Sequence, residues 1–462
     1  MKNVPLYLQI IAGIVLGAIW AILSGYLGWQ GFTSDWIDPF GKIFIKLLKL
    51  IAIPLILFSI ISGIVSLGNP KDLGRLGVRT LGLYLLTTVV AVSLGLVLVN
   101  TFKPGKALSD EVRLENRIAY ELWADNNQIE IKDGLRFSDS PENKDIVKVK
   151  EALLQIEREN EIVDKLKPKK KQGPLQALVD LVPENAFNAI AGNGSMLQII
   201  FFAIFFGIAL LYIPADKSRT IIQFVDGASE VFIKMVDIIM KGAPFFVFAL
   251  MAGVVNDIAG DNPAKIVEIF KGLGWYSLTV LIGLLLMAFA IYPGVLKLLV
   301  PKRKFFEFLR GISPAQALAF STSSSAATLP VTFECVEENL GVDKKTAGFV
   351  LPIGATVNMD GTSLYQAVAV LFLAQLHMID LTLGQQITVV LTATLASIGS
   401  AAIPSAGIVM LMVVLQSVGL NPAWIAIILP VDRILDMVRT TVNVTGDASV
   451  SVIIDQYVSE ES

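Results

Sequence analysis

Residues 358–362, Asn-Met-Asp-Gly-Thr, place an amide, a carboxylate and a hydroxyl within a segment (347–376) that is otherwise apolar enough to form a membrane helix. At bilayer depth such groups cost several kcal/mol unless partners compensate them. Gly361 weakens the helix at this point and can free backbone carbonyls for a ligand. Polar groups at a broken helix are typical of an ion or small-solute site in a transporter.

A second polar stretch lies in the last apolar segment, between residues 425 and 454. Asp436, Arg439, Thr440, Asn443 and Asp447 recur at helical spacing and are expected to share one face. Asp436 can hold a cationic amine, and the planar fork of Arg439 can hold a carboxylate. Thr440 and Asn443 can bond a second carboxylate. A ligand with one amine and two carboxylates is an acidic amino acid.

Both stretches also have a plainer interpretation. The first could be a kinked helix whose polar groups bond to their neighbours, although a second polar break later in the chain argues against this. In the second, Asp436 could form an internal ion pair with Arg439, and Asp432 could pair with Arg433. Intramembrane charges are functional by default, so these pairings remain alternatives at this point.

Oxygen-rich side chains near the two polar breaks also favour a cation site. Carboxylates, amides and freed carbonyls are ligands of hard cations, and Asp360, Asp447, Asn358 and Asn443 supply them. Two buried carboxylates would be untenable without compensation, and bound cations would offset that burial. Sodium is the natural inference, while a protonated aspartate stays possible on chemical grounds.

The elements that must position these residues are membrane helices. The 462 residues are 54% hydrophobic and only 17% charged, whereas soluble domains carry about a quarter charged residues. One cysteine, Cys335, and one histidine, His377, exclude an intramolecular disulfide framework and multi-histidine metal sites. Before residue 300 several apolar segments reach or exceed the roughly 20 residues that cross a bilayer: 5–28, 38–67, 76–102, 175–213, 219–256 and 266–300.

Charge in the connections predicts the orientation. Lys71, Arg75 and Arg79 lie between the second and third segments, and residues 302–304, Lys-Arg-Lys, follow the sixth. By the positive-inside rule both connections are cytoplasmic, which also places the N-terminus inside. The apolar run 4–27 is interpreted as a retained first helix rather than a cleaved signal peptide.

Residues 103–172 differ from the rest, because charges of both signs make up roughly two in five residues. Three crossings precede this stretch, so it is expected outside the cell as a solvated loop. Part of it, 151–167, has helical spacing of apolar residues and could form a surface helix. Its lysine run is not interpreted as a nucleic-acid patch.

Two later segments, 305–340 and 384–420, each contain two apolar arms around a polar, small-residue centre, 321–330 and 397–407. Each arm is short for a span, so a hairpin that enters and leaves on one side fits better. Each hairpin precedes a long helix with a polar break. This repetition predicts an internal structural repeat that brackets a central substrate site.

With these residues in view, the chain resembles the glutamate transporter family, the dicarboxylate/amino acid:cation symporters. The resemblance covers nearly the whole chain outside 106–172. It rests on three motifs in order: the serine-rich tip that ends Thr328-Leu329-Pro330, residues 358–362, and residues 439–447, Arg-Thr-Thr-Val-Asn-Val-Thr-Gly-Asp.

The resemblance implies an all-α polytopic membrane protein with eight transmembrane helices, two re-entrant hairpins and inverted internal repeats. It implies a homotrimer whose transport domain moves like an elevator against a scaffold, with the second hairpin as outer gate. The implied division is as follows: scaffold helices in 1–75 and 174–257, a transport-domain helix in 76–102, a charged extracellular loop in 103–173, and the transport-domain core in 258–462.

The family motifs also imply roles for individual residues. Asp436 would bind the substrate amine and Arg439 its side-chain carboxylate. The other implied substrate contacts are Ser325, Thr440 and Asn443 at the α-carboxylate, with Thr362 and the Gly407 backbone near the distal one.

Three sodium sites follow from the same resemblance. They comprise Gly354, Asn358, Asn443 and Asp447 in the first; Thr356, Ser397, Ile398 and Ser400 in the second; and Tyr84, Thr87, Thr88, Asn358 and Asp360 in the third. The presence of all five residues of the third set favours sodium over proton coupling.

Two positions depart from some family members. Ser323 stands where some archaeal members carry a hairpin-tip arginine, and Arg433 could reach the same space from the last helix. Gln366 stands where members that counter-transport potassium carry a glutamate, so potassium and proton coupling are not expected.

The predicted function is sodium-coupled symport of aspartate or glutamate by a protein that is not an enzyme. The alternatives are a proton-coupled glutamate/aspartate symporter, a C4-dicarboxylate symporter, and an anion channel or receptor. A serine hydrolase is disfavoured, because no base or elbow motif accompanies residues 323–325. The expected partners are L-aspartate or L-glutamate, sodium ions, the lipid bilayer and two further copies of the chain. The expected location is the cell (inner) membrane, with many crossings and both termini cytoplasmic.

Overall fold

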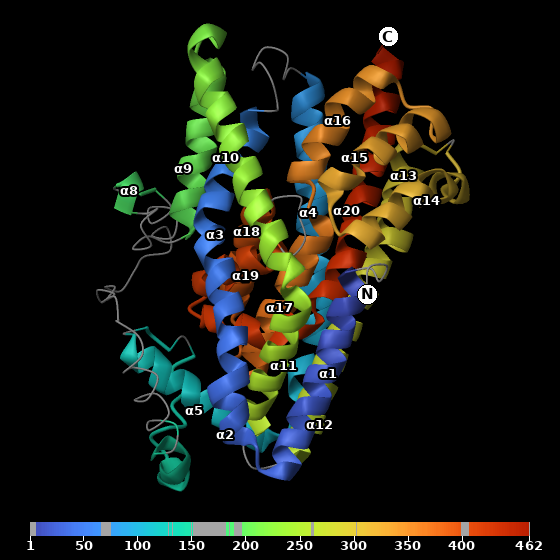
Figure 1. Cartoon of the computed structure of the whole chain (residues 1–462). Coiled ribbons are helices and arrows are strands. Elements are labelled where there is room, and N and C mark those ends of the chain that lie inside the picture. The colour runs from blue at the N-terminus through green and yellow to red at the C-terminus, as the bar shows by residue number, and fades with distance from the viewer. Residues whose placement is uncertain are drawn as a thin grey trace.

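The fold was analysed on a computed structural model. It describes residues 6–65, 75–127, 129–131, 133–148, 150, 182–183, 185–188, 196–259, 263–301, 303–398 and 406–461. Within these residues all regular structure is helical. The long helices run side by side as an elongated bundle, with the C-terminus at one end (Figure 1). The all-α class that the resemblance implies is confirmed over this part of the chain.

One group of helices lies before residue 260. It contains α1 (Leu6–Leu27), α2 (Gln30–Phe32), η1 (Thr33–Ile37), α3 (Asp38–Val65), α9 (Met196–Tyr212), α10 (Ala215–Lys241) and α11 (Ala243–Ala259). Helix α3 packs against α9, α10 and α11, and α1 packs along α11. The segment 219–256 was predicted as one apolar stretch that exceeds the length of a span. It is two helices separated at Gly242, where the Phe246 ring packs against the turn.

A second group surrounds α17 (Asp360–Leu376), which packs against α4, α12, α18, α19 and α20. Its other members are α4 (Arg75–Phe102), α12 (Pro263–Leu286), η5 (Met287–Ile291), α13 (Tyr292–Leu299), α14 (Phe305–Thr322), α15 (Ser325–Glu334), η6 (Cys335–Asn339), α16 (Lys344–Val357), α18 (Leu383–Ile398), α19 (Ala406–Ser417), η7 (Pro422–Trp424) and α20 (Ile425–Glu461). Every residue of α17 is buried, so this helix is the centre of the group.

Both predicted hairpin segments contain a helix pair. Helices α14 and α15 pack against each other and meet at Ser323, whose backbone is left-handed (φ 53°). Helices α18 and α19 also pack together, while their connection, 399–405, lies outside the described residues. By length and composition, two described stretches could cross a membrane, Gly77–Ala107 and Glu268–Leu299; Ala12–Leu27, Phe201–Tyr212 and Ala243–Gly253 are apolar but shorter.

The two predicted helix breaks have different outcomes. The first is confirmed, because Asn358 and Met359 leave helical backbone between α16 and α17. The second is wrong, because α20 is helical from Ile425 to Glu461. Its hydroxyls bond within the helix instead of interrupting it: Thr440 Oγ1 donates to the Asp436 carbonyl at 2.9 Å, and Thr445 Oγ1 donates to the Thr441 carbonyl at 2.7 Å.

The charged region after α4 also differs from expectation. Residues 103–143, here called the cap, are folded rather than a solvated loop. They form η2 (Pro104–Ala107), α5 (Asp110–Asn126) and η3 (Pro141–Asn143), and α5 lies at the end of the bundle away from the C-terminus (Figure 1). Leu108, Val112 and Tyr120 join the apolar core that contains α17. The surface helix expected over 151–167 lies outside the described residues.

Candidate functional site

The break between α16 and α17 lies directly against α20. Asn358 Nδ2 donates to Asp447 Oδ1 at 2.8 Å and to the Asn443 carbonyl at 3.1 Å. The Gly361 amide donates to Asn443 Oδ1 at 2.8 Å. The last of these bonds satisfies a backbone amide that the break leaves without an intrahelical partner. The two polar stretches of the sequence therefore form one site.

Gly361 is required by the closeness of α17 to α20. A Cβ at this position would lie 2.6 Å from the Arg439 carbonyl oxygen and 3.0 Å from the Arg439 Cα. Both atoms belong to the backbone, so no side-chain rotation could relieve the overlap. The glycine thus permits the two helices to approach at the level of the polar residues.

The third predicted cation set gathers around Asp360, whose side chain is fully buried. Thr88 Oγ1 donates to Asp360 Oδ1 at 2.6 Å, and Thr88 and Thr87 also bond to the Tyr84 carbonyl at 2.8 and 3.1 Å. The other carboxylate oxygen, Asp360 Oδ2, accepts a hydrogen bond from Tyr292 Oη at 2.9 Å. Sequence reasoning missed Tyr292, because its only signal was one tyrosine in a long apolar segment.

The residues of the first predicted cation set lie close together. Asp447 is 2% exposed and takes its bond from Asn358, whose Oδ1 atom is buried without a partner. A side chain at Gly354 would collide with the Asp447 carboxylate and the Tyr84 hydroxyl, so the Gly354 backbone lies at the same place. Among the described residues, no lysine or arginine pairs with Asp360 or Asp447. This uncompensated negative charge suits a bound cation.

The second cation set is only partly visible. Thr356 and Ser397 donate their hydroxyl hydrogens to carbonyls of their own helices, at 3.0 and 2.8 Å. Their helices α16 and α18 are in contact. Ile398 is the last residue of α18, and Ser400 lies outside the described residues.

Arg439 is the central charge of the predicted substrate stripe. Its side chain is fully buried, and its Nη2 atom lies 2.9 Å from Asp432 Oδ1 and 2.7 Å from Asp436 Oδ1. The internal pair considered for Asp436 is therefore present, whereas Asp432 pairs with Arg439 rather than with Arg433. Arg433 lies 3.5 Å from Asp436.

These ion pairs leave part of Arg439 unused. Its Nε and Nη1 atoms are buried without hydrogen-bond partners, and its guanidinium carbon lies 3.9 Å from the centre of the Tyr365 ring. A Cβ at Gly407 would lie 2.9 Å from both Arg439 Nη1 and Thr362 Cγ2, so three predicted substrate residues converge here. Two donor nitrogens, with three N–H groups in all, therefore remain for a carboxylate ligand.

The remaining substrate residues lie around this point. Ser325 begins α15 and is 4% exposed, and α15 packs against α20. Gln366 Nε2 donates to the Gly407 carbonyl at 3.2 Å, while its Oε1 atom is buried without a partner. The neutral amide at this position thus holds the beginning of α19, a contact that the sequence did not reveal.

Comparison with known proteins agrees with this geometry. Residues 6–457 match the model of the sodium:dicarboxylate symporter family. Excitatory amino acid transporter 3 of Oryctolagus cuniculus is 35% identical over 477 residues, covering 100% of this chain and 87% of the relative. An excitatory amino acid transporter of Caenorhabditis elegans is 35% identical over 462 residues, covering 99% and 88%.

A third relative, excitatory amino acid transporter 2 of Rattus norvegicus, is 36% identical over 427 residues, covering 88% of this chain and 71% of the relative. The family match extends over both groups of helices. The chain is therefore a multi-pass membrane transporter rather than an enzyme, and it belongs to the sodium:dicarboxylate symporter family.

Proposed function

We propose that this protein is a secondary active transporter that couples the uptake of acidic amino acids, aspartate or glutamate, to sodium. The observation that carries the proposal is the buried guanidinium of Arg439, which keeps two donors free beside Gly407 and Thr362. Asp436, one helical turn away, supplies negative charge for the ligand's amine. The names of the relatives, excitatory amino acid transporters, agree with this substrate class.

Sodium is proposed as the coupling ion. The buried carboxylates of Asp360 and Asp447 and the unpartnered Asn358 Oδ1 supply hard oxygen ligands, and no lysine or arginine in the described part of the chain forms an ion pair with either carboxylate. Bound sodium would neutralise Asp360 and Asp447. The substrate would be held nearby at Arg439, with Asn443 between the two sites. The residues proposed for the three ions are those of the predicted sets, including Tyr84, Thr356 and Ser400.

The transport cycle is proposed to follow the family pattern. Eight spans and two re-entrant hairpins would form a homotrimer in the cell membrane, with both termini cytoplasmic. The helices around α17 would move as a transport domain against a scaffold of α1, α3 and α9–α11, with α18–α19 as outer gate. The dense packing of α17 against its neighbours supports a rigid moving unit.

Uptake of radiolabelled L-aspartate into proteoliposomes tests the proposal. Inward sodium and inward proton gradients are compared, each for wild type and Arg439→Ala. Accumulation driven by sodium alone, and lost in the variant, is expected. Uptake driven by protons alone would contradict the sodium sites. Uptake of succinate but not aspartate would mean that the substrate is a C4-dicarboxylate rather than an amino acid. Such a substrate has no amine for Asp436 to bind.

A further inference from the structure

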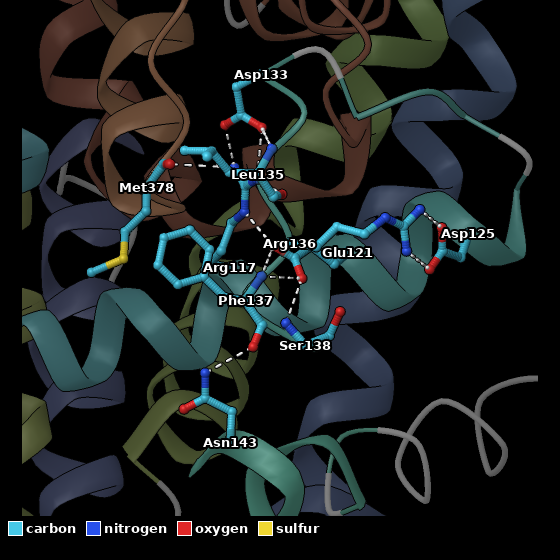
Figure 2. Close-up of polar contacts among 10 residues, drawn as sticks. All are labelled: Arg117, Glu121, Asp125, Asp133, Leu135, Arg136, Phe137, Ser138, Asn143 and Met378. Carbon is cyan, nitrogen blue, oxygen red and sulfur yellow. Dashed lines mark hydrogen bonds and ion pairs between the residues drawn. The ribbon is translucent and has the colours of Figure 1, made fainter. Parts of the chain in front are cut away.

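The cap has a polar core built on Arg117. This side chain is fully buried, and each of its five N–H groups has an acceptor (Figure 2). Nε donates to Glu121 at 2.7 Å, the two terminal nitrogens donate to the Asp133 carboxylate at 2.7 Å each, and carbonyls take the remaining hydrogens. Those carbonyls belong to Leu135 at 2.6 Å and Met378 at 3.3 Å.

In this core the ion pairs outweigh the effect of burial on the pKa values of Arg117 and Asp133. Burial of Arg117 opposes its charge, but its bonds to Asp133 and Glu121 prevail and raise its pKa. Burial likewise opposes the charge of Asp133, and the bond from Arg117 prevails and lowers its pKa. Glu121 also accepts the amides of Phe137 and Ser138, at 3.0 and 2.8 Å, and so holds the returning chain. The cap is thus folded around a fully paired charge cluster.

The cap is fixed to the outer end of α17. The Gly105 amide donates to Gln375 Oε1 at 3.2 Å, and Arg113 Nε donates to the Gln375 carbonyl at 3.1 Å. With the bond from Arg117 to Met378, three residues of the cap bind the last turn of α17 and the residues after it. Ser109 adds a bond from its amide to Glu268 of α12 at 3.0 Å.

The cap also contacts the end of the second hairpin. Tyr120 Oη donates to the carbonyl of Gly419, which follows α19, at 3.4 Å. Its ring lies 5.4 Å from the ring of Trp424 in η7, and Trp424 stacks on His377 at 3.4 Å. Tyr120 therefore lies where the end of α17 and the connection from α19 to α20 meet.

We propose that the cap and the outer ends of α12, α17 and α19 form one body, in which Arg117 and Tyr120 are positioning residues for the base of the second hairpin. The consequence of this shared body for transport rests on the proposed function, because the second hairpin is an outer gate only if the protein is such a transporter. In that case the cap travels with the transport domain.

Hydrogen–deuterium exchange of the full-length protein tests the shared body without reference to transport. Arg117→Met is expected to raise exchange at least about tenfold in residues 375–379 and 418–424. Loss of the buried ion pairs should destabilise the cap and therefore the segments that are hydrogen-bonded to it. The matched control is Arg136→Met, which removes the exposed pair with Asp125 and should change those segments less than about twofold. A rise confined to residues 103–143 would overturn the proposal.

Tyr120→Phe provides a milder variant if Arg117→Met does not fold. It keeps the ring beside Trp424 and loses one hydrogen bond, so exchange should rise about threefold in 418–424 and remain unchanged in α1 and α11. Unchanged exchange in 418–424 would contradict the role of Tyr120. At position 120 no side chain without a hydroxyl is expected to give wild-type exchange in 418–424, because it could not donate to the Gly419 carbonyl.

Cross-linking tests the movement. Ser109→Cys and Glu268→Cys, combined with Cys335→Ser, are joined by a short bifunctional maleimide. Linked protein should retain sodium-driven aspartate uptake within about twofold of unlinked protein, because the two sites do not separate. Linked protein that binds aspartate normally but does not transport it would show that the cap slides over α12. No uptake before linking would refute the proposed function alone, and the exchange experiment would still decide the shared body.

Discussion

Arg117 and Arg439 are both completely buried arginines that lie one helical turn from an acidic residue, yet their surroundings differ. Every N–H of Arg117 has an acceptor within the protein. Arg439 leaves Nε and Nη1 without partners. Leaving a buried donor unsatisfied costs about 1–3 kcal/mol, so a protein tolerates it where a ligand supplies the acceptor. On this basis Arg117 is the structural charge, and Arg439 is the proposed binding charge.

The largest expected effect comes from Arg439→Lys. The ammonium keeps the positive charge but cannot present two donors in a plane, so aspartate affinity should fall at least about 100-fold. Sodium-dependent aspartate binding by isothermal titration calorimetry measures the change. Arg117→Lys is the matched substitution, and its affinity should change less than about tenfold because it contacts no ligand. Equal losses in the two variants would refute the distinction.

Gly361→Ala tests how closely α17 must approach α20 for the binding charge to be in place. Its Cβ would meet the Arg439 backbone at 2.6 Å, so we expect a loss of about 1–3 kcal/mol in stability together with loss of aspartate binding. Thermal unfolding and binding are measured together. Gly348→Ala in α16 is the control, because its Cβ meets no atom within 4 Å and should be neutral or stabilising.

A pH titration sharpens the account of the structural charge. The pKa of Asp133 is lowered below 3.8 in the folded protein, so its contribution is fully present above that value and is lost as the pH falls through the folded pKa. Exchange within residues 110–126, corrected for the intrinsic effect of pH, should therefore be constant from neutral pH to about pH 5 and rise in stronger acid. Asp133→Asn should show faster exchange already at neutral pH. A wild-type transition near neutral pH would exclude Asp133 as its cause.

The smallest expected effect concerns Tyr292→Phe. Removing the hydroxyl leaves Asp360 Oδ2 without its 2.9 Å hydrogen bond, and we expect sodium affinity to fall about three- to tenfold. The sodium dependence of aspartate uptake gives the measurement. Tyr212→Phe, at an exposed residue of α9, should leave it unchanged. Unaltered sodium affinity in Tyr292→Phe would remove this tyrosine from the cation region.

Parts of this architecture were predictable because they depend on local chemistry. The break at residues 358–359 followed from polar groups and a glycine in an apolar segment, and the shared face of Asp436 and Arg439 followed from helical spacing. The expected break in α20 was wrong, because hydroxyls that bond to their own helix give the same polar pattern as a broken helix.

The cap was not predictable from its composition. Dense charge suggested a solvated loop, and the spacing of Arg117 and Glu121 allowed no more than a local helix pair. Asp133 contacts Arg117 because the chain reverses direction after α5. Met378 contacts Arg117 because the end of α17 lies beside the cap. Tyr292 was missed for the same reason, since its significance depends on a contact with Asp360, which is distant in the sequence.

The complete burial of α17 has a consequence for sequence variation. All 17 of its residues are enclosed by other helices, whereas α1 exposes Val15, Leu16 and Ile19. A saturating mutational scan should therefore find no tolerant face along α17, and sensitivity should not oscillate with the helical repeat. In α1 the oscillation should be plain. Sequence differences between this protein and its relatives are accordingly expected to be rarer in α17 than in the helices that have an exposed face.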